Sequence, residues 1–361
     1  MIKNYLISLL LFITVTCSYG NILVPFSQKD ITYMGRIETV ENQYAKIYWP
    51  GTSITINFKG TAIKAILKNE EEDAYFYAIV DGKENEAKKF KADTQKSVIE
   101  LASGLTNTNH TVQLFKLSNN TSTTYFYGFE LADGSAILNA TPLPRRKIEF
   151  YGNSITAGHG VDVLPGQEDS GDPVYFNNYR TYAALTARYF NAQYSCIARS
   201  GIGVLISWFP IIMPEMYDLL NPNDPTSKWD FSKYTPDIVV INLFQNDAWL
   251  TANFKHEQFK ARFGTTPPSE ATIIQSYQNF VKSIRSKYPR ASIICVLGSM
   301  DATQKGSPWP GYIEKAVKGI NDSKIYTHFF PYKDTPGHPK VAEQKVMADD
   351  LIDFINKNIQ W

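Results

Sequence analysis

The chain has 361 residues, of which 43% are hydrophobic and 20% are charged. This length and composition are typical of a globular protein with a sizeable core, in one large domain or two, and they exclude a disordered chain. The 36 basic and 35 acidic residues leave a formal net charge of +1, which excludes binding to nucleic acid through net charge.

The first 20 residues have the pattern of an export signal. Lys3 is followed by an apolar run at 6–15 that is too short to span a bilayer comfortably, and Ser18-Tyr19-Gly20 is a small-x-small cleavage site. We therefore expect a signal peptide at 1–20, export to the periplasm, the cell surface or the medium, and no membrane segment in the mature chain. Lipid attachment at Cys17 is the less favoured alternative, because the residues before it fit a lipobox poorly.

Residues 21–140 have the pattern of an antiparallel β domain. Short runs of strand-forming residues follow one another from residue 45 to residue 129, and turn residues such as Pro50-Gly51 and Asp81-Gly82 separate them. Because no convincing helix interrupts these runs, we expect an all-β sandwich.

A different pattern begins after residues 141–146, which contain two prolines and a pair of arginines and are expected to be a linker. From 147 to 361, strand-like runs alternate with helical ones. The run 238–243 is almost wholly apolar, as in a strand covered on both faces, and 269–288 has the periodicity of a helix. This alternation predicts an α/β doubly wound domain with a parallel sheet.

The cysteines and histidines do not suggest a metal site. Cys196 and Cys295 both lie in apolar, strand-like runs, so we expect buried free thiols rather than a disulfide. No cluster of Cys and His has the spacing of metal ligands. We therefore expect neither a metal nor a cofactor.

The first residue with a chemical role is Ser154, in Gly152-Asn153-Ser154-Ile155-Thr156 after the strand-like run 147–151. A tight turn from strand to helix exposes a serine hydroxyl and directs backbone N–H groups to the same place, as a serine nucleophile requires. Such a turn is also a common connection, so acyl transfer needs a base and oxyanion donors from elsewhere in the chain.

His338 is the favoured general base among the five histidines. It lies on a loop after the last predicted strand, at the edge where parallel sheets build their sites. Asp334, four residues earlier, is expected to accept the imidazole N–H and fix the tautomer. The alternative for Asp334 is a structural role in the turn before Thr-Pro-Gly.

Two further residues are expected to bind an oxyanion together with the backbone N–H of Ser154. Gly201 offers an unhindered backbone N–H, and Asn246 offers its side-chain amide. Each follows a predicted strand, so both should reach the same edge of the sheet as Ser154. Asp247 is expected to brace the loop rather than react.

In this order, these residues resemble the sequence blocks of the SGNH (GDSL-like) hydrolases. The run 152–156 is similar to the first block, with Asn153 in place of the usual aspartate. Gly201 is similar to the second block, Asn246 to the third and His338 to the fifth.

The resemblance narrows to carbohydrate esterase family 2. The runs 213–217 and 229–231, which lead into 237–243, resemble that family, as does Asn178-Tyr179. The family places a jelly-roll sandwich before the esterase domain, so the resemblance implies an all-β jelly-roll sandwich at 21–140 and an SGNH hydrolase-like catalytic domain at 147–361. It also implies removal of acetyl groups from plant polysaccharides such as xylan or glucomannan.

Two positions depart from the family pattern. Phe244 stands where the third block usually has glycine, and its ring is expected to narrow the acyl pocket, to form a platform for a sugar or to fill the core. The acid of the family usually lies three residues before the histidine, where this chain has Thr335. Some members are thought to use a Ser–His dyad, so both a triad with Asp334 and a dyad remain open.

Trp249 and Trp309 are expected to line the sugar site, with ordinary packing as the alternative for each. The sequence thus predicts a secreted serine esterase whose partner is an acetylated polysaccharide or oligosaccharide, not a nucleic acid. One alternative is an esterase of lipids or other small acyl groups with the same fold, which Phe244 makes less favourable. The other is a non-catalytic carbohydrate-binding protein.

Overall fold

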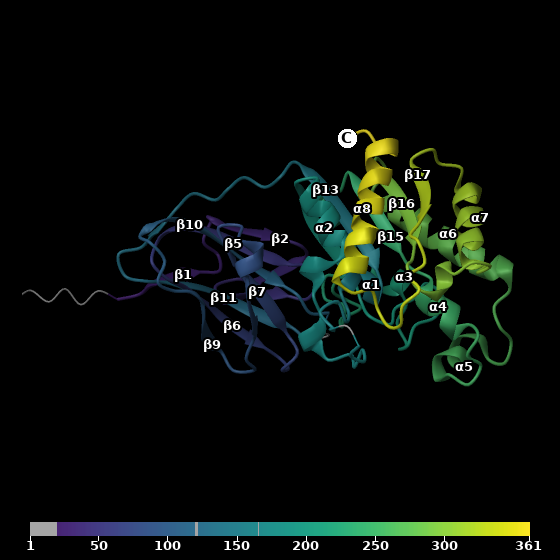
Figure 1. Ribbon diagram of the computed structural model, residues 1–361, viewed down its shortest axis with the longest axis horizontal. Coiled ribbons are helices and arrows are strands. Elements are labelled where there is room, and N and C mark those ends of the chain that lie inside the picture. Colours follow the sequence, from purple (N-terminus) through teal and green to yellow (C-terminus); the bar gives the residue numbers. More distant parts are fainter. Residues whose placement is uncertain (1–19, 120–121, 165) are drawn as a thin grey trace, which may run out of the picture.

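The computed structural model describes residues 20–119, 122–164 and 166–361. An all-β domain is followed by an α/β domain that lies beside it (Figure 1). Nearly all of the predicted signal peptide at 1–20, including Cys17, lies outside the described residues. Within the described part of the chain, no helix combines the length and apolar character needed to cross a membrane.

The first domain is built from two antiparallel sheets of six strands each, as predicted. Their facing side chains form one hydrophobic core, to which Leu67 and Phe126 contribute from one sheet and Ile56 and Leu114 from the other. In spatial order the first sheet contains β3 (Ile37–Val40), β4 (Tyr44–Ile47), β11 (Thr124–Leu131), β6 (Ile63–Asn69) and β9 (Ser97–Ala102), with β1 (Ile22–Pro25) paired to β11. The second contains β12 (Ala136–Ile137), β5 (Ser53–Gly60), β10 (Thr108–Lys116), β7 (Tyr75–Val80) and β8 (Lys88–Lys91), with β2 (Ile31–Met34) paired to β5.

The second domain contains a parallel sheet of five strands with helices on both faces (Figure 1). In spatial order the strands are β14 (Ala192–Ala198), β13 (Arg146–Gly152), β15 (Ile238–Asn242), β16 (Ser292–Leu297) and β17 (Ile325–Phe329). The longer helices are α2 (Tyr182–Tyr189), α6 (Glu270–Lys287), α7 (Trp309–Ile320) and α8 (Val341–Asn358), and the shorter ones are α1 (Ser154–Ala157), α3 (Met213–Met216), α4 (Gln245–Leu250) and α5 (Glu257–Phe263).

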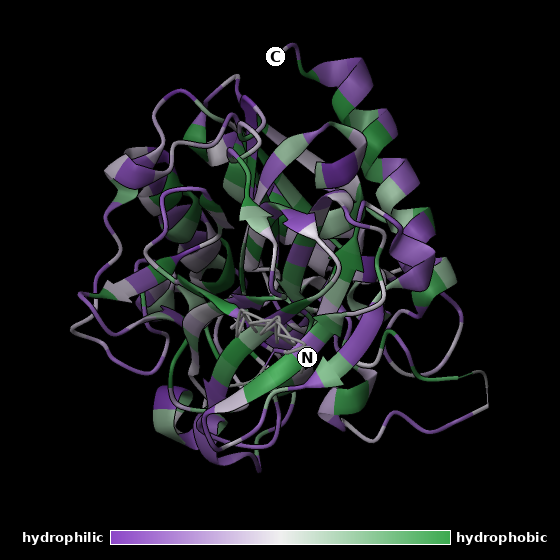
Figure 2. Cartoon of the chain, turned by 90° about the vertical axis from the view of Figure 1, so that its left-hand side faces the viewer, coloured by the Kyte–Doolittle hydropathy of each residue, from purple (hydrophilic) through white to green (hydrophobic). Residues whose placement is uncertain are grey.

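Strand β15 shows why its sequence is apolar throughout. Val239 and Ile241 belong to the core that includes residues of α6 and α7, whereas Ile238 and Val240 belong to the core that includes residues of α2 and α8. Both faces of the strand are therefore buried. Figure 2 shows hydrophobic residues, in green, along such inner strands. Helix α8 at the surface carries both hydrophobic and hydrophilic residues, as expected for a helix with one face on the sheet.

The strand order indicates where a site belongs. β14 and β15 lie on opposite sides of β13, so the order of the strands reverses at this point. Parallel sheets bind ligands at the carboxyl ends of the strands next to such a reversal. The turn with Ser154 follows β13 and the segment with Asn246 follows β15, so the topology brings these two predicted site residues to the same edge.

Several further expectations can be compared with the structure. Cys196 and Cys295 are free and buried, as predicted. The predicted helix 269–288 is α6, which differs by one residue at each end. The last strand of the first domain ends at Ile137 and β13 begins at Arg146, and the domain boundaries drawn beside these positions stay predictions.

A buried arginine joins the two domains. Arg36, on the connection between β2 and β3, is 1% exposed. Its Nη1 donates to the backbone oxygens of Tyr217 (2.7 Å) and Leu219 (2.8 Å). Its Nη2 lies 3.3 Å from Oε1 of Glu149, which is in β13. The first domain is therefore fixed to the sheet that carries Ser154.

Candidate active site

Ser154 is held at a turn between β13 and α1. The side chain of Asn153 accepts a hydrogen bond from the backbone N–H of Ile155 (3.0 Å) and caps the short helix. A Cβ atom at Gly152 would lie 2.1 Å from the hydroxyl oxygen of Thr156, so the turn requires glycine there. The arrangement predicted for this turn is thus present, and it places the Ser154 hydroxyl at the carboxyl edge of the sheet.

His338 lies between β17 and α8, and its ring reaches the serine. Its Nε2 is 2.9 Å from Oγ of Ser154. Burial lowers the pKa of His338, and the hydrogen bond to Asp169 opposes this. The structure therefore brings together the predicted nucleophile and the predicted base.

The carboxylate on the other side of the His338 ring belongs to Asp169. Its Oδ2 lies 2.5 Å from Nδ1 of His338 and also accepts from the backbone N–H of that residue (3.3 Å). Asp334 is exposed, and both ring nitrogens of His338 already have other partners. The prediction that Asp334 holds the imidazole is therefore corrected to Asp169, and the geometry is that of a triad rather than a dyad.

The ionisation of Asp169 suits this position. Burial alone would raise the pKa of its carboxyl group, but the hydrogen bond from His338 and the nearby His159 outweigh that effect and hold the pKa well below the usual range. A carboxylate can only accept hydrogen bonds, so Nδ1 of His338 carries the proton and Nε2 is left to accept from Ser154.

The predicted oxyanion residues follow neighbouring strands, Gly201 on the loop after β14 and Asn246 in the first turn of α4. Gly201 has a φ of +82°, a conformation that glycine adopts readily. Nδ2 of Asn246 donates to the backbone oxygen of Ile202 (2.8 Å), and its Oδ1 accepts from Nε1 of Trp208 (3.1 Å). These contacts fix the orientation of the Asn246 amide and use one of its two N–H groups.

Asp247 braces the loop, as expected. Its buried carboxylate accepts from the backbone N–H groups of Val204, Leu205 and Ile206 at 2.7 to 3.2 Å. Burial raises its pKa to about 6, although these hydrogen bonds oppose the rise. The group thus holds the loop that starts at Gly201 in place against α4.

Two of the three aromatic residues predicted to bind sugar belong to the core instead. Phe244 is fully buried, and its ring packs against Tyr277 at 4.6 Å and Trp309 at 5.0 Å between centroids. Trp309 is 8% exposed at the start of α7. Neither ring offers a face to a ligand, so the expectation that they contact sugar is corrected to ordinary packing.

Trp249, predicted to line the sugar site, is partly exposed, and so is Trp208, which the sequence did not single out. Nε1 of Trp249 donates to Asp301 (2.8 Å), and Asp301 lines a cavity of about 290 Å³ together with Met300 and residues 332–337. The ring of Trp208 is 46% exposed beside Asn246. An exposed aromatic ring next to a predicted oxyanion residue can offer a face to the apolar side of a ligand.

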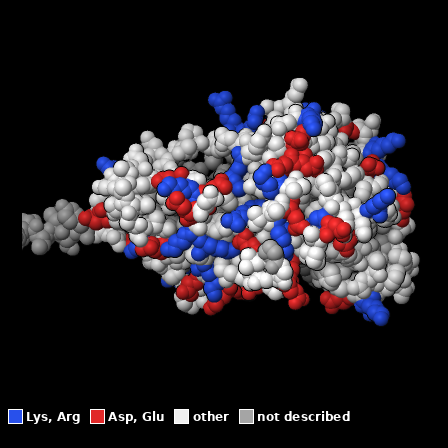
Figure 3. Space-filling model, viewed as in Figure 1, with Lys and Arg blue, Asp and Glu red and all other residues white. Residues whose placement is uncertain are grey.

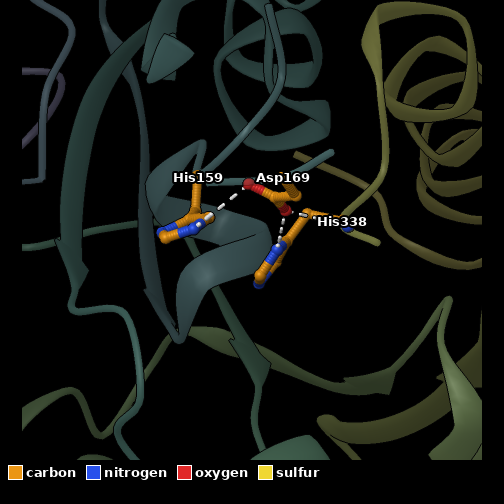
Figure 4. A group of neighbouring side chains, drawn as sticks. All are labelled: His159, Asp169 and His338. Atoms are coloured by element: carbon orange, nitrogen blue, oxygen red, sulfur yellow. Dashed lines mark hydrogen bonds and ion pairs between the residues drawn. The ribbon is translucent and has the colours of Figure 1, made fainter. Parts of the chain in front are cut away.

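Three of these side chains form the group in Figure 4. The rings of His159 and His338 both point toward Asp169 (Figure 4), and each of the three side chains offers a potential ligand atom within 4.8 Å of the others. Two tetrahedral zinc ligands with bonds of ~2.0 Å lie ~3.3 Å apart, whereas Asp169 and His338 are only 2.5 Å apart. We therefore interpret the group as a hydrogen bond between His338 and Asp169 with His159 at ion-pair distance from the same carboxylate.

The sequence held little evidence for Asp169. It lies on the irregular loop between α1 and α2, far from His338 in the chain, and no spacing rule joins the two. Glu168-Asp169-Ser170-Gly171-Asp172 marks that loop only as polar and acidic. Trp208 could have been noticed, because it lies in the same short segment as the predicted oxyanion residue Gly201.

The chain is similar to known carbohydrate esterases. Residues 33–142 match the family model described as carbohydrate esterase 2 N-terminal. A solved family two carbohydrate esterase from Clostridium thermocellum, in complex with cellohexaose, is 32% identical, with a TM-score of 0.80, over 91% of this chain and 98% of that one. The cellulase/esterase CelE of Acetivibrio thermocellus is 32% identical over 92% of this chain, which spans 40% of that protein. An acetylxylan esterase / glucomannan deacetylase of Cellvibrio japonicus is 23% identical over 94% of this chain and 91% of its own length.

Proposed function

Because the chain belongs to carbohydrate esterase family 2, we propose that it is a serine esterase that removes acetyl groups from a plant polysaccharide such as xylan or glucomannan. The observation that carries this proposal is the hydrogen-bonded row of Ser154, His338 and Asp169. The reaction is the hydrolysis of a carboxylic ester.

In the first half of the reaction, Oγ of Ser154 attacks the acetyl carbonyl carbon while its proton passes to Nε2 of His338. Asp169 holds the imidazolium that forms. The N–H groups of Ser154, Gly201 and Asn246 hold the oxyanion. When the ester bond to the sugar breaks, His338 returns the proton to the sugar oxygen, and the acetyl group stays on Ser154.

In the second half, His338 takes a proton from a water molecule as the water oxygen attacks the acetyl-enzyme. The bond from the carbonyl carbon to Oγ of Ser154 then breaks, and His338 returns the proton to that oxygen. Acetic acid leaves and ionises in solution, so the enzyme regains its starting state with no net change in charge.

The surroundings of the site support a carbohydrate as the group that carries the acetyl. Trp208 is exposed beside Asn246, and Trp249 donates to Asp301, which lines the cavity next to His338. On the face shown in Figure 3, acidic and basic side chains are intermixed rather than gathered by sign. Such a surface suits a substrate that is recognised by stacking and hydrogen bonds.

A long acyl chain fits this site less well. The cavity beside His338 is lined mostly by polar residues, among them Asp301, Lys333, Asp334 and Thr335. A fatty acyl group would need apolar walls to bury its methylene groups. The small acetyl group has no such requirement, which favours a polysaccharide deacetylase over a lipid esterase.

The first domain is proposed to be a jelly roll that forms one wall of the site. Asn119, which follows β10, lies 2.8 Å from Oγ of Ser200, the residue before Gly201. This contact supports a structural role for the domain at the oxyanion loop. Export is proposed from the signal-like pattern of residues 1–20 alone.

The proposal is tested by the release of acetate from acetylated xylan, acetylated glucomannan and a small aryl acetate. Ser154→Ala is expected to abolish all three activities and to leave the circular dichroism spectrum unchanged. Ser286→Ala, on an exposed position of α6, is the matched control and should keep full activity. More than a few per cent of residual turnover in Ser154→Ala would remove Ser154 as the nucleophile. Glycan binding by the native chain without turnover would favour a carbohydrate-binding protein.

A further inference from the structure

Two histidines face the carboxylate of Asp169, one on each oxygen. His338 binds Oδ2, while Nε2 of His159 lies 3.5 Å from Oδ1, within ion-pair distance (Figure 4). Oδ1 is buried and has no hydrogen-bond partner of ordinary length among the described residues. His159 is thus the group that can compensate the charge on this oxygen, although the catalytic steps above do not use it.

The other nitrogen of His159 leads to the oxyanion loop. Nδ1 of His159 lies 3.2 Å from Oγ of Ser200. The amide of Asn119 can be oriented so that its oxygen and its nitrogen both have hydrogen-bond partners. Its oxygen then accepts from the backbone N–H (2.6 Å) and the hydroxyl (2.8 Å) of Ser200, and its nitrogen donates to the backbone oxygen of Ala198 (3.2 Å). The single hydroxyl hydrogen of Ser200 is then used on Asn119, so Oγ must accept a hydrogen bond from Nδ1 of His159.

Both ring nitrogens of His159 therefore have acceptors in front of them. Nδ1 faces the Ser200 oxygen, and Nε2 faces the carboxylate of Asp169. A lone pair on either nitrogen would meet another lone pair, whereas an imidazolium places a hydrogen at each.

We infer that His159 is a positively charged positioning residue, which faces the oxygen of Asp169 that His338 does not contact and ties Asp169 through Ser200 to the loop of Gly201. This inference rests on the proposed function, because it assigns His159 a part in the same esterase site. The row of contacts then runs from Ser154 through His338, Asp169 and His159 to the oxyanion loop.

A positive charge on His159 lowers the pKa of the general base His338. The rings of His159 and His338 lie 4.3 Å apart between centroids, so a charge on His159 opposes protonation of His338. Burial and this charge lower the pKa of His338, against the effect of Asp169. The other charges that act on the group are Lys340, which also lowers the pKa of His338, and Lys333, which interacts with Asp169. His338 thereby stays neutral, and able to accept the proton of Ser154, at a lower pH.

His159→Gln tests this effect, because glutamine keeps a hydrogen-bond donor and removes the charge. The acid limb of the kcat/KM profile on a small aryl acetate is expected to move to higher pH. The ratio of kcat/KM at about pH 5.5 to that at about pH 8 should fall by about threefold relative to the native chain. An equal loss at every pH, with the limb unmoved, would mean that His159 only packs, and the inference would be wrong.

His328→Gln is the matched control for that experiment. His328 also pairs with a carboxylate, Asp350, at 2.6 Å, but it lies in β17 against α8, away from Ser154. Its replacement should leave the acid limb in place. A shift of the same size in this variant would show that loss of any histidine–carboxylate pair moves the profile.

A second measurement depends neither on turnover nor on the folding of the His159 variant. In Ser154→Ala protein labelled with ¹⁵N in its histidine rings, both nitrogens of His159 are expected to carry hydrogen at neutral pH. The ¹⁵N signals of His159 are assigned as the ring signals that shift most when Ser200→Ala is added, because His159 contacts Ser200. A neutral ring would overturn the inference and leave the proposed esterase function intact, whereas activity in Ser154→Ala would overturn the function and not this result.

Discussion

Asp169 is the residue that separates a triad from a dyad in this site. Its carboxylate fixes the proton of His338 on Nδ1. Asp169→Asn should leave the fold intact and lower kcat by up to roughly 10⁴, because an amide can hold the ring in the wrong tautomer. The measurement is kcat on a small aryl acetate, with thermal unfolding as the check on folding.

The control for Asp169 is Asp334, an acid closer to His338 in sequence but exposed to solvent. Asp334→Asn should cost less than about tenfold in kcat, which corresponds to ~1.4 kcal/mol. If Asp334→Asn proved as damaging as Asp169→Asn, the assignment of the acid from the geometry would be wrong.

Single residues differ in how far their roles can be predicted from the sequence. Ser154 and His338 were predicted because each lies in a short local pattern. Asp169 is brought to the site by a long irregular loop, and no local pattern records that path. Phe244 occupies a position with φ +88°, which explains why glycine is usual there. The sequence shows the substitution, but not that the ring turns into the core.

Strand β10 carries a lysine in the interior of the first domain. Lys116 is fully buried, and its Nζ donates to the backbone oxygen of Tyr48 (2.9 Å). Burial lowers its pKa from the ordinary 10.5 to about 7, although Asp73 and Glu70 oppose the change. Above pH 7 the folded chain therefore carries this amine mostly neutral, while the unfolded chain stays protonated up to about pH 10.

Between these two pKa values unfolding takes up a proton, so the lysine makes the free energy of unfolding rise with pH, by at most ~1.4 kcal/mol per pH unit. Lys116→Met should remove this rise between about pH 7.5 and pH 9.5, as measured by denaturant unfolding. Lys59→Met, an exposed position in β5, should keep it. Identical slopes in the native chain and Lys116→Met would show that the amine is charged when folded.

Regular elements were predicted more closely than the segments between them. The run 238–243 became β15, and 269–288 became α6, because burial on one or two faces leaves a clear period in the sequence. The short helices α3 and α4 were not predicted by the same reasoning. They span one or two turns, too few residues for a period to appear.

At the scale of the whole molecule, the buried pair Arg36–Glu149 joins the two domains. Glu149 also accepts from the hydroxyl groups of Tyr151 (2.7 Å), Tyr288 (2.6 Å) and Ser195 (3.0 Å). Arg36→Met leaves this carboxylate without its cation. The free energy of unfolding should fall by about 3–5 kcal/mol, and adding Glu149→Gln should recover part of the loss.

Equilibrium unfolding in urea measures both variants. Lys345→Met, which breaks an exposed pair with Asp349 on α8, is the control and should change stability by less than about 0.5 kcal/mol. If Arg36→Met stayed within about 1 kcal/mol of the native chain, the domain contact would contribute much less than a buried ion pair should.

The contacts of Arg36 with the second domain also restrict how such a protein can evolve. Its acceptors, the carboxylate of Glu149 and the backbone oxygens of Tyr217 and Leu219, all lie in the other domain. Recombination between Ile137 and Arg146 would join this first domain to a different esterase domain. If that domain lacked an acid at the position of Glu149, the positive charge of Arg36 would be buried without a counter-charge. The two domains are therefore expected to be inherited as one unit, with successful crossovers lying outside them rather than in the segment that connects them.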